Sequence, residues 1–139
     1  MRLTVGITQL LPEWEIVLQQ IGVSFEIISL KEPISADQFS VVIVTTKGAK
    51  NEKDVLLHYL NSGGSILTEA EVGKWLFNIG TVPAFVNTIE PTKDPIFNGV
   101  LPGFIQMRLF LPRRGDMLDS ESGRKLVQIH TSGKGTAII

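Results

Sequence analysis

The sequence contains no cysteine among its 139 residues. Disulfides, thiolate metal sites and cysteine nucleophiles are therefore excluded within this chain. An excess of charge of either sign is also lacking, because 13 basic and 14 acidic residues give a formal net charge of −1. Without such an excess there is no electrostatic argument for nucleic acid or an anionic membrane as the main partner.

Long apolar runs are missing as well. No stretch approaches the ~18 consecutive apolar residues of a membrane-spanning helix. The first residues show no basic segment followed by an apolar one, as a secretory signal peptide would. We therefore expect a soluble protein that is cytoplasmic by default, because nothing in the sequence fixes its compartment.

Loops that could cradle a phosphate are not found either. Residues 8–11 follow the first expected strand but contain no glycine, which such a loop needs. The Gly-Lys-Gly of residues 133–135 lacks the spacing of a P-loop and precedes a strand, so a hairpin turn is the favoured interpretation. We expect no cofactor and no metal ion in this chain.

The first 80 residues do contain an alternation of strand-like and helix-like segments. Apolar, β-branched stretches predict strands over 2–8, 23–30, 39–44 and 65–68, and helical spacing predicts helices over 12–21, 51–62 and 72–79. This order is typical of an α/β fold with a mainly parallel central sheet and helices on both faces.

Local signals define the ends of these helices. Gly22 is expected to end the first one in a left-handed conformation. Asn51 is expected to cap the second, with Asp54 three residues later in a box-like arrangement. The apolar face of the first helix is expected to consist of residues spaced i, i+3, i+4 and i+7: Trp14, Val17, Leu18 and Ile21.

The second half follows a different pattern. Strands are expected over 84–89, 105–111, 125–130 and 136–139, joined by loops rich in Pro, Gly and Asp rather than by helices. We expect these strands to be antiparallel or mixed and to extend one edge of the sheet. The whole chain, residues 1–139, is expected to form a single domain. Because its last residues are apolar and natural termini are usually polar, we also expect it to be the N-terminal part of a longer protein.

Three stretches resemble the class I glutamine amidotransferase-like fold, a relative of flavodoxin. The first is a helix followed by Gly-Gly and a strand at 56–67, the second is the Asp-Pro turn at 94–100, and the third is the Gly-Lys-Gly entry to a late strand at 132–138. In the amidotransferases, the strand of the first stretch ends in a strained turn that carries the nucleophilic cysteine. The resemblance places Ala70 at that position, between Glu69 and Glu71. An alignment shifted by one residue places Glu69 or Glu71 there instead, and none of the three is a thiol.

An alanine has no lone pair and cannot attack a carbonyl carbon, so the resemblance implies a domain without glutaminase activity. The family has a glycine two residues after the cysteine, and Val72 stands at that position here. The resemblance therefore does not predict a strained turn at this junction. His130 ends a late strand, as the family's catalytic histidine follows one. However, the family's His-x-Glu pattern is not present, because Thr131 and Ser132 come next.

Glu69 and Glu71 are the remaining candidates for chemistry. They follow a strand of the predicted parallel sheet, at the edge where α/β folds bind ligands. They could serve as a general acid/base pair or as a weak site for a divalent cation. The simpler interpretation, which we favour, is that acids in the first turn of a helix interact well with its dipole.

The resemblance implies a non-catalytic accessory or interaction domain of a larger protein. Domains of this kind are fused to carbohydrate-active enzymes such as polysaccharide deacetylases and β-galactosidases. The expected partner is an adjoining domain of the same polypeptide or a second copy, with Phe104 and Phe110 as a possible apolar contact. The alternative is a carboxylate-dependent hydrolase or a small-ligand-binding domain that uses Glu69 or Glu71. As a hydrolase it requires one of these carboxyls to have a raised pKa in a cleft.

Overall fold

The computed structural model describes residues 4–85, 88–89, 93–99, 103–104, 114–120, 123–125, 127 and 129–139. The first part of the chain forms β1 (Thr4–Ile7), α1 (Pro12–Ile21), β2 (Ser24–Ile27), β3 (Val41–Val44), α2 (Lys50–Asn61), β4 (Ser65–Thr68) and α3 (Ala70–Phe77). It continues with β5 (Gly80–Phe85), β6 (Thr88–Ile89), a short 3₁₀ helix (Pro95–Phe97), β7 (Gly103–Phe104), β8 (Arg114–Ser120), β9 (Gly123–Lys125), β10 (Ile129–Ser132) and β11 (Gly135–Ile138).

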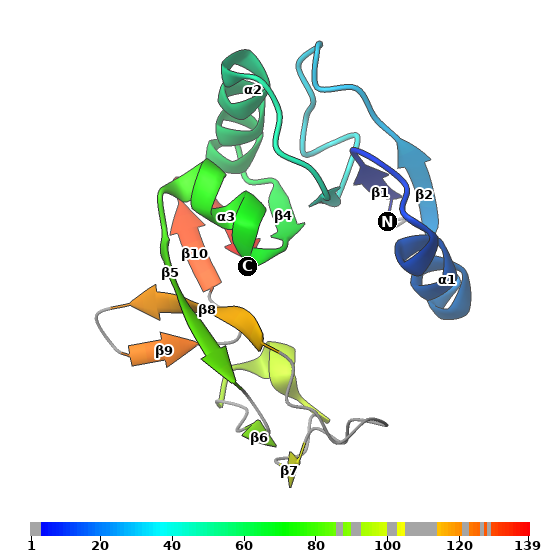
Figure 1. Ribbon diagram of the computed structural model, residues 1–139. Coiled ribbons are helices and arrows are strands. Elements are labelled where there is room, and N and C mark those ends of the chain that lie inside the picture. Colours follow the sequence, from blue (N-terminus) through cyan, green and yellow to red (C-terminus); the bar gives the residue numbers. More distant parts are fainter. Residues whose placement is uncertain are drawn as a thin grey trace.

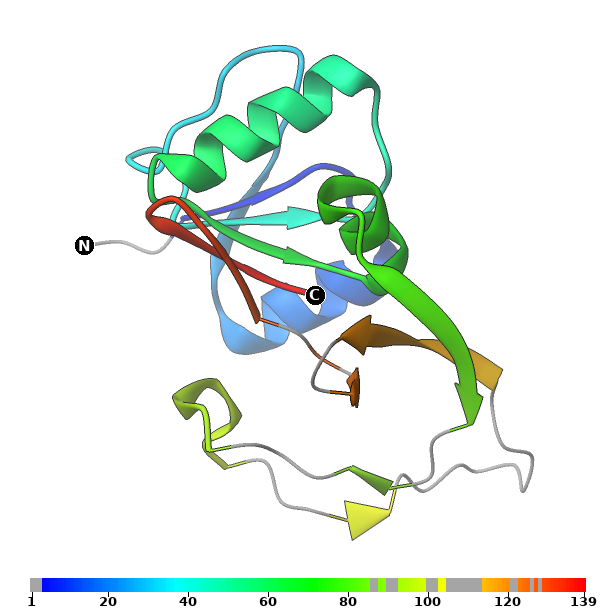
Figure 2. The ribbon, with the colours of Figure 1, turned by 90° about the vertical axis from the view of Figure 1, so that its left-hand side faces the viewer.

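A six-stranded sheet in the order β10-β11-β4-β3-β1-β2 forms the centre of the molecule (Figure 1). All neighbouring strands in it are parallel except β10, which runs antiparallel to β11. Figure 2 shows α2 above this sheet and α1 below it. The α/β fold, with a mainly parallel sheet, helices on both faces and an antiparallel C-terminal strand at one edge, confirms the predicted fold class.

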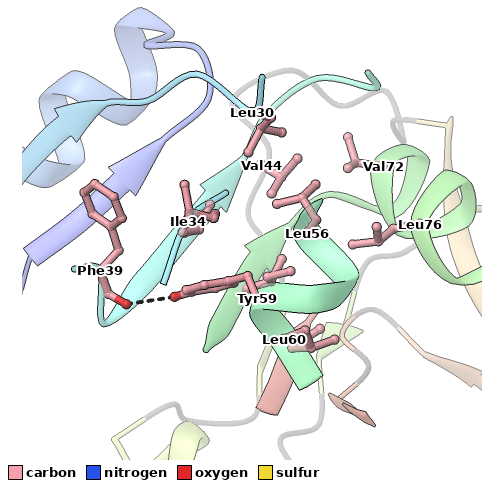
Figure 3. Packing of buried hydrophobic residues seen from close by; sticks show 12 residues of the cluster. Leu30, Ile34, Phe39, Val44, Leu56, Tyr59, Leu60, Val72 and Leu76 are labelled. Carbon is pink, nitrogen blue, oxygen red and sulfur yellow. Dashed lines mark hydrogen bonds between the residues drawn. The ribbon is translucent and has the colours of Figure 1, made fainter. Parts of the chain in front are cut away.

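Side chains of successive strand residues alternate between two cores. Val42 and Val44 pack with α2 and α3 in the larger core, which Figure 3 shows, whereas Ile43 between them packs with Leu18 of α1. Three of the four β-branched residues in β3 are buried for this reason: the strand lies inside the sheet with helices on both sides.

On the face of α1, one apolar residue from each strand forms a row across the whole sheet. The aligned residues are Ile27, Ile7, Ile43, Leu67, Ile138 and Ile129. In the middle of this row Ile7 and Ile43 are buried, but Ile27 and Ile129 at its ends are 65% and 37% exposed. Helix α1, which lies on this face, therefore covers only part of the row.

Tyr59 joins α2 to the sheet in the larger core. Its side chain is completely buried, and its hydroxyl donates to the carbonyl oxygen of Phe39 at 2.9 Å, as the dashed line in Figure 3 marks. The amide of Ser65 donates to the same hydroxyl at 3.3 Å. Gly64 lies under the aromatic ring, where a β-carbon would collide with it. Packing thus requires Gly64, whereas Gly63 before it has a left-handed φ of 106°.

The predicted helix ends are partly confirmed. Gly22 has a left-handed φ of 68° and ends α1 as expected. Asn51, however, is not a cap, since α2 already begins at Lys50 and the carboxylate of Glu52 accepts from the amide of Ala49 at 2.6 Å. The third helix ends before Ile79, because Asn78 adopts a left-handed conformation with a φ of 56°.

The predicted apolar face of α1 is only half buried. Trp14 and Leu18 pack in the core below the sheet, but Val17 and Ile21 are 44% and 62% exposed. Helical spacing identified which residues are apolar, and the structure shows that nothing in the described part of the chain covers two of them fully.

The second half differs most from its prediction. Among the described strands of this half, β10 and β11 extend the main sheet, β5, β8 and β9 form a separate three-stranded sheet, and β6 pairs with β7. Strand β8 occupies a stretch that was expected to be a loop. In place of one strand over 125–130, the structure has β9, which ends at Lys125, and β10, which begins at Ile129. The strand expected over 105–111 lies outside the described residues. The hairpin turn at Gly133-Lys134 is confirmed, because Ser132 pairs with Gly135 across it.

Candidate functional site

The order of the sheet identifies the place where a ligand would be expected. From β1 the chain moves to β2 on one side and then returns to β3 on the other. In doubly wound sheets, such a reversal opens a crevice at the carboxyl ends of the two central strands, and ligands bind there. In this chain the position lies between Thr8, after β1, and Thr45, after β3.

Hydrogen bonds between the two loops occupy this position. The amide of Thr45 donates to the hydroxyl of Thr8 at 3.1 Å, and the two hydroxyl oxygens are 3.3 Å apart. The hydroxyl of Thr45 donates to the carbonyl oxygen of Gln9 at 2.9 Å. Groups that could bind a ligand in a crevice are therefore bonded to each other, and they tie the two loops together.

The junction between β4 and α3 is the place where the resemblance puts a nucleophile. Glu69 has φ −87° and ψ 162°, an ordinary extended conformation, and Ala70 is the first residue of the helix. Among the described residues, Asn78 at the far end of the helix is the non-glycine residue with a positive φ. The junction therefore has no strained turn that would present the side chain of Ala70 for attack.

Both glutamates beside Ala70 are exposed to solvent. Glu71 forms an ion pair with Lys47, with 2.7 Å between the carboxylate oxygen and Nζ. The hydrogen bond and the charge of Lys47 lower the pKa of the Glu71 carboxyl. A general acid at neutral pH needs a raised pKa, so the environment of Glu71 is the opposite of the one that the carboxylate hypothesis requires.

His130 is distant from this junction. It pairs with Ala137, which in turn pairs with Ile66 of β4. It therefore lies two strands, or about 10 Å, to the side of β4. It is also level with Ile66, four residues before Ala70 along the strand direction. The backbone thus does not bring His130 together with Ala70, Glu69 or Glu71.

Threonines at the carboxyl edge were not among the predicted site residues. Strand β4 ends with Thr68, whose buried hydroxyl donates to the carbonyl oxygen of Val44 at 2.8 Å, and Thr8 and Thr45 directly follow β1 and β3. A threonine at the end of three neighbouring strands was visible as a pattern. The bonds that Thr8 and Thr45 form between their loops depend on the order of the strands, which the sequence did not specify.

Metal-binding clusters and membrane-spanning helices are both absent from the described residues. They contain no group of three or more His, Asp or Glu side chains that could hold a metal ion. Within them there is also no helix of the length and apolarity that crossing a membrane requires. Of the apolar contact expected from sequence, Phe110 lies outside the described residues and Phe104 is described only in its backbone.

Comparison with known proteins yields a similarity of fold. No protein-family model and no curated protein matches the chain. Among solved structures, an exo-β-1,4-mannosidase from Opitutaceae bacterium strain TAV5 is similar, with a TM-score of 0.55 and 16% sequence identity. The match covers 99% of this chain and 30% of the mannosidase chain. At this identity the match shows a common fold, and the chain spans less than a third of the protein that it matches.

Proposed function

We propose that this chain is a non-catalytic accessory domain of an amidotransferase-like kind, which acts in a larger carbohydrate-active protein by contact with its other parts. The observation that carries the proposal is the closure of the carboxyl edge between β1 and β3. There the loops are tied by the hydrogen bonds of Thr8 and Thr45, in the place where a working α/β domain keeps a crevice.

The junction after β4 supports the same proposal. It carries Ala70 instead of a nucleophile, its backbone is unstrained, and its neighbour Glu71 is held ionised by Lys47. An acyl-transfer site needs a nucleophile, a base and an oxyanion hole in mutual reach. A junction that has no nucleophile and no adjacent histidine is better suited to a structural role.

The link to carbohydrate chemistry draws on the similarity to the mannosidase. That protein is, by its name, an enzyme that cleaves β-1,4-mannosides, and a stretch amounting to 30% of its length has the fold of this chain. A fold of this kind can therefore occur inside a larger glycoside hydrolase. Polysaccharide deacetylases and β-galactosidases are the other hosts that the sequence resemblance suggests.

The first experiment assays the purified chain on glutamine, on β-1,4-linked mannooligosaccharides and on acetylated polysaccharides. We expect no turnover of any of them. An activity that Glu69→Gln or Glu71→Gln abolishes, while Glu52→Gln leaves it intact, would contradict the proposal in favour of a carboxylate-dependent enzyme. Glu52 is a suitable control because its carboxylate bonds the backbone at the start of α2.

The second experiment examines the polypeptide that naturally carries this chain. We expect that polypeptide, or an enzyme that binds it stoichiometrically, to cleave or deacetylate a polysaccharide. If neither the polypeptide nor any protein bound to it acts on carbohydrate, the carbohydrate part of the proposal is wrong, and the accessory role can be judged separately.

A further inference from the structure

The asparagines of the sequence differ in the residue that follows them. Four precede a residue that has a side chain, and these are Asn51, Asn61, Asn78 and Asn87. Asn98, in contrast, precedes Gly99. A backbone nitrogen can attack the side-chain amide carbon of the asparagine before it, and a side chain next to that nitrogen hinders the attack. Because glycine has no β-carbon, the nitrogen after Asn98 is the least hindered one.

Asn98 lies in an exposed turn. It directly follows the short 3₁₀ helix Pro95–Phe97, and its backbone amide donates to the carbonyl oxygen of Pro95 at 3.1 Å. Both Asn98 and Gly99 are exposed to solvent. Hydroxide and water, which the chemistry of this side chain requires, therefore reach it in the folded protein.

The two groups that would react are not held in place. Within the described residues, no hydrogen bond engages the side-chain amide of Asn98 or the backbone amide of Gly99. To attack, the Gly99 nitrogen has to rotate toward the side chain about the ψ of Asn98, which is 124°. A β-carbon built on Gly99 would have nothing within 4 Å. The rotation therefore breaks no hydrogen bond and finds open space.

Asn61, at the end of α2, is held in the way that Asn98 is not. Its side-chain oxygen accepts from the hydroxyl of Ser132 at 2.7 Å. The next backbone amide, that of Ser62, donates to the carbonyl oxygen of His58 at 3.0 Å. Both bonds have to break before the Ser62 nitrogen can reach the Asn61 side chain, so the fold protects this asparagine.

From these observations we propose that Asn98 is a site of spontaneous deamidation in the folded protein. The Gly99 nitrogen gives its proton to hydroxide and forms a bond to the side-chain carbonyl carbon of Asn98. The bond from that carbon to the amide nitrogen breaks, and the amide leaves as ammonia after taking a proton from water. Water then opens the cyclic imide at one of its two carbonyls, which gives aspartate or isoaspartate at this position.

The modification changes the turn in two ways. Either product carries a carboxylate in the turn that Asp94 begins, where the Asp94 carboxylate accepts from the amide of Ile96 at 3.0 Å. The isoaspartate product also inserts a side-chain carbon into the backbone between the 3₁₀ helix and Gly99. Because exposed charges interact weakly, we expect the modified chain to stay folded and to be separable from the original by ion exchange.

The first test compares the folded chain with the chain in urea, at a mildly alkaline pH below the range in which Tyr59 ionises. Mass spectrometry of proteolytic peptides follows each asparagine. We expect Asn98 to react in the folded chain within about threefold of its rate in urea, because no local opening is required. Asn61 should react at least about tenfold more slowly when folded, because its two hydrogen bonds have to break first. Protection of Asn98 as strong as that of Asn61 would overturn the proposal.

The second test identifies the attacking atom. Gly99→Ala places a methyl group beside the nitrogen and should slow the reaction of Asn98 several-fold. The matched control is Gly22→Ala, which puts alanine at another left-handed glycine with open space around it and should leave the rate unchanged. An unchanged rate in Gly99→Ala would show that this nitrogen is not the nucleophile.

The products give an independent check. A methyltransferase that is specific for isoaspartyl carboxyls should label the peptide that contains residue 98 after incubation of the chain, and leave the fresh chain unlabelled. Aspartate without isoaspartate would indicate direct hydrolysis by water and would refute the cyclic imide. None of these outcomes bears on the proposed function, which makes no use of this turn.

Discussion

Removal of one hydroxyl group tests how α2 is fixed to the sheet. Tyr59→Phe keeps the aromatic ring in its completely buried position but removes the acceptor of the Ser65 amide and the donor to the Phe39 carbonyl oxygen. Buried polar groups that lose their partner cost about 1–3 kcal/mol. We expect a destabilisation within this range in urea unfolding, with an unchanged dependence on denaturant because the surface exposed on unfolding stays the same.

The same hydroxyl makes stability depend on pH at alkaline values. Burial raises the pKa of Tyr59 above its ordinary value, because the tyrosinate anion would lose its hydration. Between the unfolded and the folded pKa, the unfolded chain has released this proton while the folded one retains it. The free energy of unfolding therefore falls as pH rises above about 10, by up to ~1.4 kcal/mol per pH unit. Below that pH the hydroxyl is protonated in both states, and its contribution to the free energy of unfolding is fully present.

The assay for this shift is unusually direct. Tyr59 is the one tyrosine of the sequence, so the ultraviolet difference absorbance of tyrosinate reports on it alone. We expect its titration to occur above that of the urea-unfolded chain, and the alkaline loss of stability to be smaller in Tyr59→Phe. A titration at the unfolded value, or a substitution without measurable effect on urea unfolding, would show that this hydroxyl is not bonded in the buried site.

Four further substitutions test packing and charge. Gly64→Ala should destabilise by the upper part of about 1–3 kcal/mol, because the new methyl group collides with the ring above it. Gly22→Ala, with open space around a left-handed φ of 68°, should cost only about 1–2 kcal/mol. Urea unfolding measures both variants, and a larger loss of stability for Gly22→Ala than for Gly64→Ala would contradict this reasoning. Leu56→Ala, at a completely buried position, should cost about 2–5 kcal/mol in the same measurement. Lys47→Met should return the pKa of Glu71 toward its ordinary value with little change in stability, since the pair is exposed; an unchanged NMR titration of Glu71 would contradict the cause given for its shift.

Local signals in the sequence predicted those features of the fold that local physics determines. The strand 65–68 and the left-handed Gly22 were predicted correctly, because a short apolar segment after Gly-Gly and a glycine after a helix each have few alternatives. Asn51 was not the cap, since the carboxylate of Glu52 already satisfies the amide of Ala49. Residue propensity favoured Asn51 as the cap. It does not account for the bond between Ala49 and Glu52, which depends on the path of the loop before the helix.

Longer-range features were predicted less well. The pairing of β11 with β4, and the separation of β5, β8 and β9 into their own sheet, depend on contacts between distant residues that composition does not encode. The hydrogen bonds between Thr8 and Thr45 were missed for the same reason, because they form only where the order of the strands brings two loops together. The amidotransferase resemblance and the role of Ala70 stay predictions.

The mismatch at α1 carries more information than the correct predictions. Helical spacing predicted a broad apolar face that included Val17 and Ile21, yet α1 buries Leu18 and leaves these two exposed. A sequence pattern that exceeds the observed burial is expected where a structure lacks a contact, because exposed apolar side chains give the isolated domain no stability. At the carboxyl edge the relation is reversed, since polar groups suited to a ligand are satisfied within the protein. The described part of this chain thus ties the loops after β1 and β3 to each other, while Val17 and Ile21 on α1 stay exposed.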